Sequence, residues 1–176
     1  LCEYSHAMGN SNGGLQEYWK CFRQTNSVQG GFIWDLIDQG LSGEQRSGKS
    51  WNYGGDYGDS PNDAQFCING LLFPDRSPHP SIHEVKYLQQ PVEFSVDFES
   101  GNLKIRNNFS FMRLDAFDIL WKVKFDNERK AISGILNLPA VSANSECVIP
   151  WRQELPNLGS IAESLQFKEC WIEFFV

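Results

Sequence analysis

Apolar and polar residues alternate with a period of two through much of the second half of the chain. Between positions 92 and 98 every even position is Val or Phe, and every odd position is Glu, Ser or Asp. This alternation predicts a half-buried strand over 92–98, and a turn at 100–102 returns the chain as a strand over 103–106. The same pattern predicts further strands over 117–125, 131–136, 147–149 and 170–176. Short strands with regular turns are typical of an antiparallel β-sandwich.

The first half of the chain shows helical spacing instead. Leu15, Trp19 and Phe22 recur at intervals that predict a helix over 14–24. A second helix is predicted over 80–89, with proline at its start and its inward face formed by Ile82, Val85 and Leu88. Short apolar runs at 1–4 and 30–35 predict two strands on either side of the first helix. Together these elements predict a β-α-β unit with a right-handed crossover.

Composition changes near residue 90, which predicts two domains, 1–91 and 92–176. Twelve of the 15 glycines and all five tyrosines precede residue 91, whereas nine of the 13 phenylalanines follow it. Residues 36–79 contain ten Gly or Pro and no clear periodic element. A stretch this long without secondary structure is usually functional in a compact domain.

Charge, hydropathy and cysteine spacing argue against a nucleic-acid-binding, membrane-spanning or zinc-binding protein. The net charge of −7 is spread over both halves without a basic patch, which argues against nucleic acid as a partner. No apolar run reaches the length of about 18 residues that would predict a membrane span. Five cysteines at positions 2, 21, 67, 147 and 170 show no zinc-binding spacing. We expect free thiols in the cytoplasm, or an extracellular protein that does not rely on disulfides.

Five short motifs occur in one order along the first half of the chain. They are Leu1–Asn10, Gly30–Asp35, Tyr53–Asp59, Asn62–Gly70 and Pro78–Pro80. In order and spacing they resemble the large bacterial-type β-galactosidases of glycoside hydrolase family 2. The resemblance implies the C-terminal part of a (β/α)8 TIM barrel followed by an immunoglobulin-like β-sandwich. Because the chain starts inside a motif and stops inside an apolar run, we expect a piece of a longer polypeptide, with a sandwich that lacks its end.

The resemblance implies that Glu3 is the catalytic nucleophile of a retaining β-galactosidase. Such enzymes use one carboxylate to attack the anomeric carbon and a second to protonate the leaving oxygen. The family takes the second carboxylate from an earlier barrel strand that this chain lacks, so we expect the chain by itself to be inactive. Taken alone, Glu3 would be read as an ordinary surface acid.

Two further residues are implied to bind the sugar. His6 matches a residue that contacts sugar hydroxyls in the family, although a lone histidine is more often structural. Trp34 matches an apolar wall beside the sugar, where a flat indole suits the C–H faces of galactose. Its alternative interpretation is plain core, since it lies in a predicted buried strand.

The resemblance also implies a metal site in the long loop. The backbone carbonyl of Phe66 and the side-chain amide of Asn69 match ligands of Na⁺ beside the sugar 6-hydroxyl, and hard cations take such oxygens. The alternative is a simple turn, because Asn-Gly forms turns readily. The main Mg²⁺ ligands of the family lie outside this chain, with Asn62 near a peripheral Mg²⁺. Three acids at 56, 59 and 63 do not fit a calcium loop and are predicted to brace turns.

Two classes of function stay open from the sequence. The first is a fragment of a retaining β-galactosidase that acts on β-galactosides such as lactose, in a parent enzyme expected to be a homo-oligomer. A β-glucuronidase of the same family is a lesser alternative. Asp35 favours galactosidase over it, because β-glucuronidase relatives usually carry Asn at this position. The second class is a non-catalytic piece, in which the sandwich is a spacer or subunit-contact module and the barrel remnant is inert.

Overall fold

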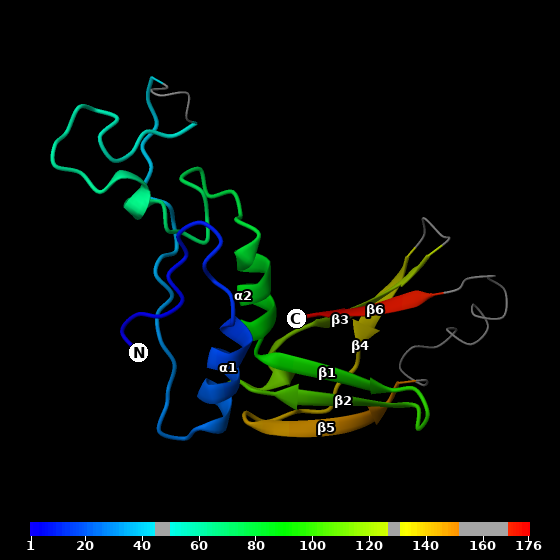
Figure 1. The fold of residues 1–176 in the computed structure, drawn as a ribbon. Helices are drawn as coiled ribbons and strands as arrows, with labels where there is room; N and C mark the ends of the chain where they lie inside the picture. The colour runs from blue at the N-terminus through cyan, green and yellow to red at the C-terminus, as the bar shows by residue number, and fades with distance from the viewer. Residues whose placement is uncertain (45–49, 127–130, 152–168) are drawn as a thin grey trace. The chain divides into compact units, whose positions relative to one another are not determined.

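The computed structural model divides the chain into two compact units, Leu1–Gln90 and Pro91–Val176 (Figure 1). It describes residues 1–44, 50–126, 131–151 and 169–176. The division falls one residue before the boundary that composition predicts. Each unit has a hydrophobic core of its own.

Two α-helices pack together in the first unit, as their apolar spacing predicts. Helix α1 spans Leu15–Gln24 and helix α2 spans Ser81–Gln89 (Figure 1). Leu15 and Val85 are buried, and Phe22, Ile82 and Leu88 pack against the same core. With ten and nine residues, these helices are far shorter than the roughly 20 residues needed to span a bilayer.

The two strands predicted before and after α1 are reduced to one parallel bridge, between Tyr4 and Ile33. The expected parallel pairing is present, but it does not extend into a ladder. The backbone explains the short pairing, since Ser5 has a φ of 49° and Gly30 a φ of 125°. Both values lie outside the extended region, so the chain leaves the strand conformation directly after Tyr4 and enters it only after Gly30.

In the described parts of this segment, residues 36–44 and 50–79, the secondary structure is isolated bridges and one short 3₁₀ helix, η1, at Ala64–Cys67. Ile37 pairs with Leu72 in parallel, which brings the two ends of this long segment together. Two of the acids predicted to brace turns do so. Asp56 accepts a hydrogen bond from the backbone N–H of Tyr53 at 2.8 Å, and Asp59 accepts one from Gly55 at 3.2 Å.

The described residues of the second unit form two antiparallel three-stranded sheets. One sheet has the order β1-β2-β5 and the other the order β4-β3-β6 (Figure 1). The strands are β1 Val92–Asp97, β2 Asn102–Asn107, β3 Ile119–Phe125, β4 Ile132–Leu136, β5 Ser145–Pro150 and β6 Cys170–Phe175, with a 3₁₀ turn, η2, at Leu114–Ala116. Every predicted strand is present, with ends shifted by up to two residues.

Both sheets contribute to one apolar core. Buried side chains alternate along β3 at Ile119, Trp121, Val123 and Phe125. They meet buried residues of the other sheet, which are Val92, Leu103, Ile105 and Ile149. The period of two in the sequence therefore marks the faces that turn inward.

The prediction that Phe98 continues the inward face of β1 is wrong. Strand β1 ends at Asp97, whose carboxylate accepts backbone hydrogen bonds from Glu99 and Ser100. Phe98 is therefore part of a turn, and its ring lies edge-on to Trp151 at 5.9 Å between centroids. These backbone and side-chain hydrogen bonds, chiefly the one from the Ser100 hydroxyl, lower the pKa of Asp97 below its ordinary value.

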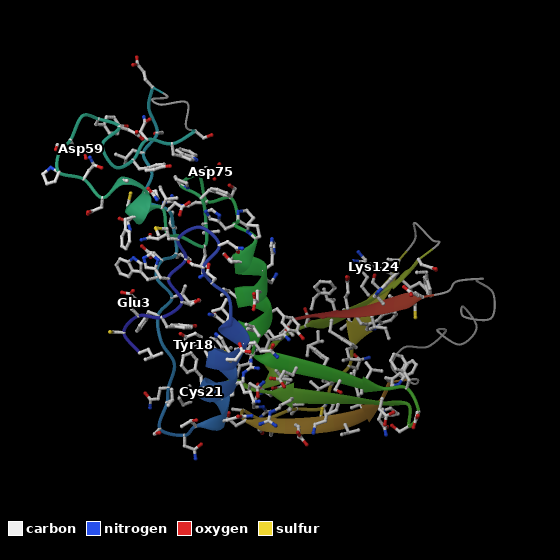
Figure 2. All side chains as sticks on the ribbon, viewed as in Figure 1. Glu3, Tyr18, Cys21, Asp59, Asp75 and Lys124 are labelled. Carbon is white, nitrogen blue, oxygen red and sulfur yellow. The ribbon has the colours of Figure 1, made fainter. Side chains whose placement is uncertain are left out.

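All five cysteines are free thiols, as the sequence predicts. Cys21 lies on the exposed surface of α1 (Figure 2), and Cys147 is partly buried on β5. Burial raises the pKa of the Cys147 thiol, so this residue is a poor nucleophile at neutral pH.

Neighbouring residues of β2 provide a test of the shared core. Leu103 is completely buried, so Leu103→Ala should lower the free energy of unfolding by about 2–5 kcal/mol because it removes packing and leaves a cavity. Lys104 faces solvent and pairs with Glu146 at 2.8 Å, so Lys104→Ala should cost less than about 1 kcal/mol. Chemical denaturation of both variants measures the difference. Equal losses would contradict the core assignment.

Candidate functional site

Glu3 lies at the surface on an N-terminal segment that is tied to residues 30–34 (Figure 2). The backbone N–H of Tyr4 donates to Phe32 O at 2.9 Å, and Trp34 N–H donates to Tyr4 O at 3.3 Å. Within the described part of the chain, the Glu3 carboxylate makes no hydrogen bond or ion pair. Its backbone is thus positioned while both carboxylate oxygens remain available.

The loop after Tyr4 is closed by its own hydrogen bonds. The buried Asn12 side chain donates to Ser5 O at 2.7 Å, and the Ser11 hydroxyl donates to the carbonyls of Met8 and His6. Small polar residues therefore replace regular secondary structure between residues 5 and 12. This closed loop holds the backbone that carries His6.

His6 and Phe66 come together although 60 positions separate them in the sequence. Their ring centroids lie 5.5 Å apart with the planes tilted by 46°. The Nε2 atom of His6 is buried and has no hydrogen-bond partner among the described residues. A buried polar atom without a partner is unusual in a folded protein, so this nitrogen suits a ligand.

Asn69 adds a second buried polar atom that lacks a partner. Its side-chain amide donates to the backbone carbonyl of Phe66 at 2.9 Å, which draws the two predicted metal ligands into contact. The residue is 3% exposed, and its Oδ1 atom has no hydrogen-bond partner within the described residues. Two oxygens, one from each residue, therefore lie in one small region.

The peptide group between Trp34 and Asp35 joins the two parts of the site. Its carbonyl accepts a hydrogen bond from Ala7 N–H at 2.7 Å, and its N–H donates to Asn69 O at 2.6 Å. The Trp34 side chain is 44% exposed, so it is not plain core. A half-exposed indole can offer a flat face to a ligand.

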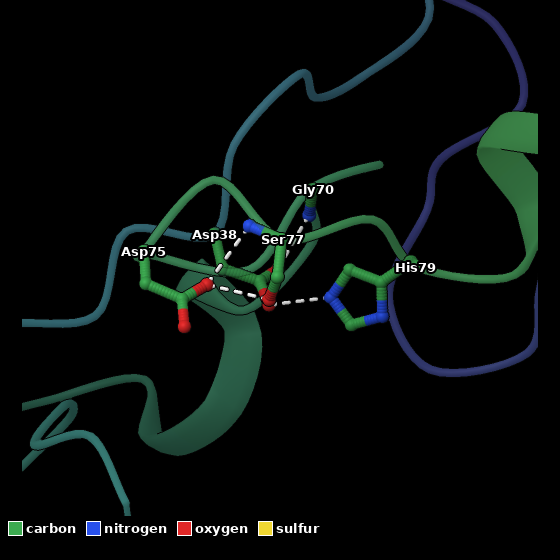
Figure 3. Close-up of polar contacts among 5 residues, drawn as sticks. All are labelled: Asp38, Gly70, Asp75, Ser77 and His79. Atoms are coloured by element: carbon green, nitrogen blue, oxygen red, sulfur yellow. Dashed lines mark hydrogen bonds and ion pairs between the residues drawn. The ribbon is translucent and has the colours of Figure 1, made fainter.

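Sequence reasoning missed a buried carboxylate next to this region. Asp38 is 4% exposed and pairs with His79, with 2.7 Å between Oδ2 and Nε2 (Figure 3). Its other oxygen accepts a hydrogen bond from Gly70 N–H at 2.6 Å. His79 lies in one of the motifs quoted above, but no local spacing connects it to an acid 41 positions earlier.

Other features of the unit set limits on its chemistry. Among the residues described, no three His, Cys, Asp or Glu side chains gather as a metal site. A groove of about 630 Å³ lies between residues 31–36 and α2, but none of the five predicted site residues lines it. Burial raises the pKa of Tyr4, so its hydroxyl is protonated at neutral pH. A free carboxylate, two unsatisfied polar atoms and an exposed indole together suit a polyhydroxylated ligand.

A family model of the TIM barrel domain of glycosyl hydrolases family 2 matches residues 1–94. The match covers the whole first unit, with Glu3, the His6 loop and the long loop. The α-helices and the parallel bridges described above lie inside this matched region.

Curated relatives resemble both units. A β-galactosidase of Alteromonas mediterranea is 45% identical over 171 residues, which is 96% of this chain and 15% of that protein. A β-galactosidase of Vibrio cholerae is 56% identical over 115 residues, 65% of this chain and 11% of that protein. A β-galactosidase of Photobacterium profundum is 47% identical over 150 residues, which is 83% of this chain and 14% of that protein. The matched part of the chain thus spans 11% to 15% of the length of these relatives.

Proposed function

The chain belongs to glycosyl hydrolase family 2, and from this membership we propose that it is the part of a retaining β-galactosidase that carries the catalytic nucleophile. The named relatives, which match between 65% and 96% of the chain, support galactosidase over other activities of the family. The substrate class is β-galactosides such as lactose.

Glu3 is the proposed nucleophile. Its carboxylate attacks the anomeric carbon of the galactosyl group, and the glycosidic oxygen leaves with a proton supplied by an acid elsewhere in the parent protein. Water then attacks the galactosyl ester, gives its proton to the same acid group, and releases Glu3 as a free carboxylate. The exposed carboxylate of Glu3, anchored through the Tyr4 backbone, is suited to this attack.

One observation carries the proposal most strongly. His6, Phe66 and Asn69, three residues that the resemblance assigns to sugar and ion binding, meet in one place. Two of them keep a buried polar atom that has no hydrogen-bond partner among the described residues, His6 Nε2 and Asn69 Oδ1. Sugar hydroxyls and a cation are the ligands that would satisfy these atoms. Trp34 supplies an apolar wall beside them.

Asn69 and Phe66 are the proposed holders of Na⁺. The buried, unpartnered Oδ1 of Asn69 and the Phe66 carbonyl are neutral oxygens, which suit a hard monovalent cation. When bound, the ion would supply a positive charge that orients a sugar hydroxyl. For Mg²⁺ the described residues offer no acidic cluster, and the Asn62 amide oxygen already accepts a hydrogen bond from Ala64 N–H at 3.1 Å. We therefore expect the Mg²⁺ ligands elsewhere in the parent protein.

The proposed architecture is the end of a (β/α)8 barrel, residues 1–91, followed by an immunoglobulin-like sandwich, residues 92–176. Exposed apolar side chains at Leu1, Phe32 and Leu36 support this, since further barrel strands and helices would cover them. The two sheets with one shared core support the sandwich. We assign the second unit a spacer or subunit-contact role in a cytoplasmic homo-oligomer.

Replacement of the nucleophile is the first test of this proposal. In the full-length protein, Glu3→Gln should reduce turnover of a chromogenic galactoside by at least ~10³-fold, about 4 kcal/mol of transition-state stabilisation, because an amide cannot attack the anomeric carbon. Binding of a thiogalactoside inhibitor should change little. Glu84→Gln, at an exposed position of α2, is the matched control. Equal turnover in both variants would remove Glu3 from the mechanism.

The sodium assignment has its own test. Asn69→Ala should raise KM for a galactoside about tenfold, because one buried hydrogen-bonding or ligand interaction is lost. It should raise KM for the 6-deoxy analogue much less. It should also abolish any stabilisation by NaCl relative to KCl in thermal unfolding. Asn26→Ala, at an exposed loop position, is the control. Equal losses for both substrates, with the sodium effect intact, would contradict this assignment.

A further inference from the structure

Asp38 is a buried carboxylate that the proposed chemistry does not use. Its side chain is 2% exposed, and both oxygens are engaged, one by Gly70 N–H at 2.6 Å and one by His79 Nε2 at 2.7 Å (Figure 3). Burying a carboxylate costs several kcal/mol unless hydrogen bonds and a partner compensate. A turn in a surface loop can form without a buried carboxylate. We therefore looked for a role of the Asp38–His79 pair in the neighbouring site.

The Asp38–His79 pair is connected to the backbone of Asn69, a residue of the proposed ion site. Asn69 precedes Gly70, and its own carbonyl accepts a hydrogen bond from Asp35 N–H at 2.6 Å. The backbone of Asn69 is thus held on one side by Asp35 and on the other by Asp38 through Gly70. A fixed backbone fixes the origin of the Asn69 side chain, which reaches back to Phe66 O.

Close packing makes this clamp rigid. A Cβ atom at Gly70 would lie 2.1 Å from Asp38 N and 2.4 Å from Ile37 C, so only glycine lets the two segments approach this closely. Neither neighbour is a flexible side chain that could move aside. The Asn69-Gly70 pair is therefore constrained by contact with residues 37 and 38, beyond its general preference for turns.

His79 is itself held in place. Its ring stacks on Phe73 with 3.6 Å between centroids and an interplanar angle of 28°. Its backbone N–H donates to Leu71 O at 3.0 Å. The ring therefore meets Asp38 from a fixed direction. By contrast Asp75, in the preceding turn, bonds to Ser77 and is exposed (Figure 3).

We propose that Asp38 and His79 are a positioning pair that holds the Asn69 side chain and the Phe66 carbonyl at the site. Neither residue touches the substrate. Their effect reaches the site through Gly70 and the Asn69 backbone. This inference rests on the proposed function, because the consequence of misplacing Asn69 is read in galactoside binding.

A double-mutant cycle in the full-length protein tests the pair. We compare His79→Ala, Asn69→Ala and the double variant, and measure KM and kcat for a galactoside and for its 6-deoxy analogue. His79→Ala should raise KM for the galactoside about tenfold, as Asn69→Ala does, and raise it little for the 6-deoxy analogue. The double variant should show no further rise in KM, because the first substitution has already removed the contribution of the Asn69 side chain.

Conservative and control variants separate positioning from folding. His79→Gln, whose amide can still donate to Asp38, should restore most of the affinity. It also keeps the test valid if His79→Ala fails to fold. His83→Ala, at an exposed position of α2, and Asp75→Ala, in the turn of Figure 3, should leave KM unchanged. The thermal shift produced by a thiogalactoside inhibitor gives a readout that does not depend on turnover.

The outcomes distinguish the inference from the proposed function. A wild-type protein that does not hydrolyse galactosides overturns the proposed function and the role of the pair with it. An active wild-type protein in which the two single effects multiply to about 100-fold in the double variant overturns the pair alone. A folded His79→Gln variant that loses affinity equally for both substrates, with no rescue, also overturns the pair alone. Selective, non-multiplying effects with rescue by Gln support the positioning role.

Discussion

The candidate site depends on one peptide group, between Trp34 and Asp35. Its carbonyl accepts a hydrogen bond from Ala7 and its N–H donates to Asn69 O. One peptide thereby joins the segment after Glu3 to the end of the long loop. Its two partners, Ala7 and Asn69, are buried, and buried backbone groups need hydrogen-bond partners, so this pairing holds three segments that are distant in the sequence close together. The polar side chains of the site come from these segments.

This constraint explains how a site forms with so little regular secondary structure. Among the described residues of 1–14 and 25–80, the secondary structure is one short 3₁₀ helix and isolated bridges, and side-chain hydrogen bonds hold several of the loop segments in place. Asn12 closes the His6 loop, while Asp38 clamps Gly70. Most of these donors and acceptors are satisfied within the chain. His6 Nε2 and Asn69 Oδ1 have no partner in the part of the chain that the structure describes, and both belong to the proposed ligand site.

Periodicity predicted the elements of this fold better than their ends. The alternation around Val123 and the helical spacing of Leu15 gave the buried faces correctly, because burial of one face is what creates such patterns. Phe98 continued the alternation in the sequence, yet Asp97 ends the strand by capping a turn. At Tyr4 the predicted strand became one bridge, since the backbone of Ser5 leaves the extended region.

The candidate site was less accessible to physical reasoning from the sequence. Glu3, His6 and Asn69 were selected through a family resemblance, because no local rule predicts that residues 6 and 66 meet. The Asp38–His79 pair has no signature in local spacing and was missed. Such pairs depend on the path of the whole loop, which only the three-dimensional structure defines.

The central claim is that Glu3 is the group that forms the covalent intermediate. The most direct measurement is to inactivate the full-length protein with a 2-fluoro galactosyl reagent, which traps the galactosyl ester, and to locate the label by peptide mass spectrometry. We expect a single label on the peptide that contains Glu3, on the Glu3 carboxylate. A label on any other carboxylate, with Glu3 unmodified, would contradict this claim.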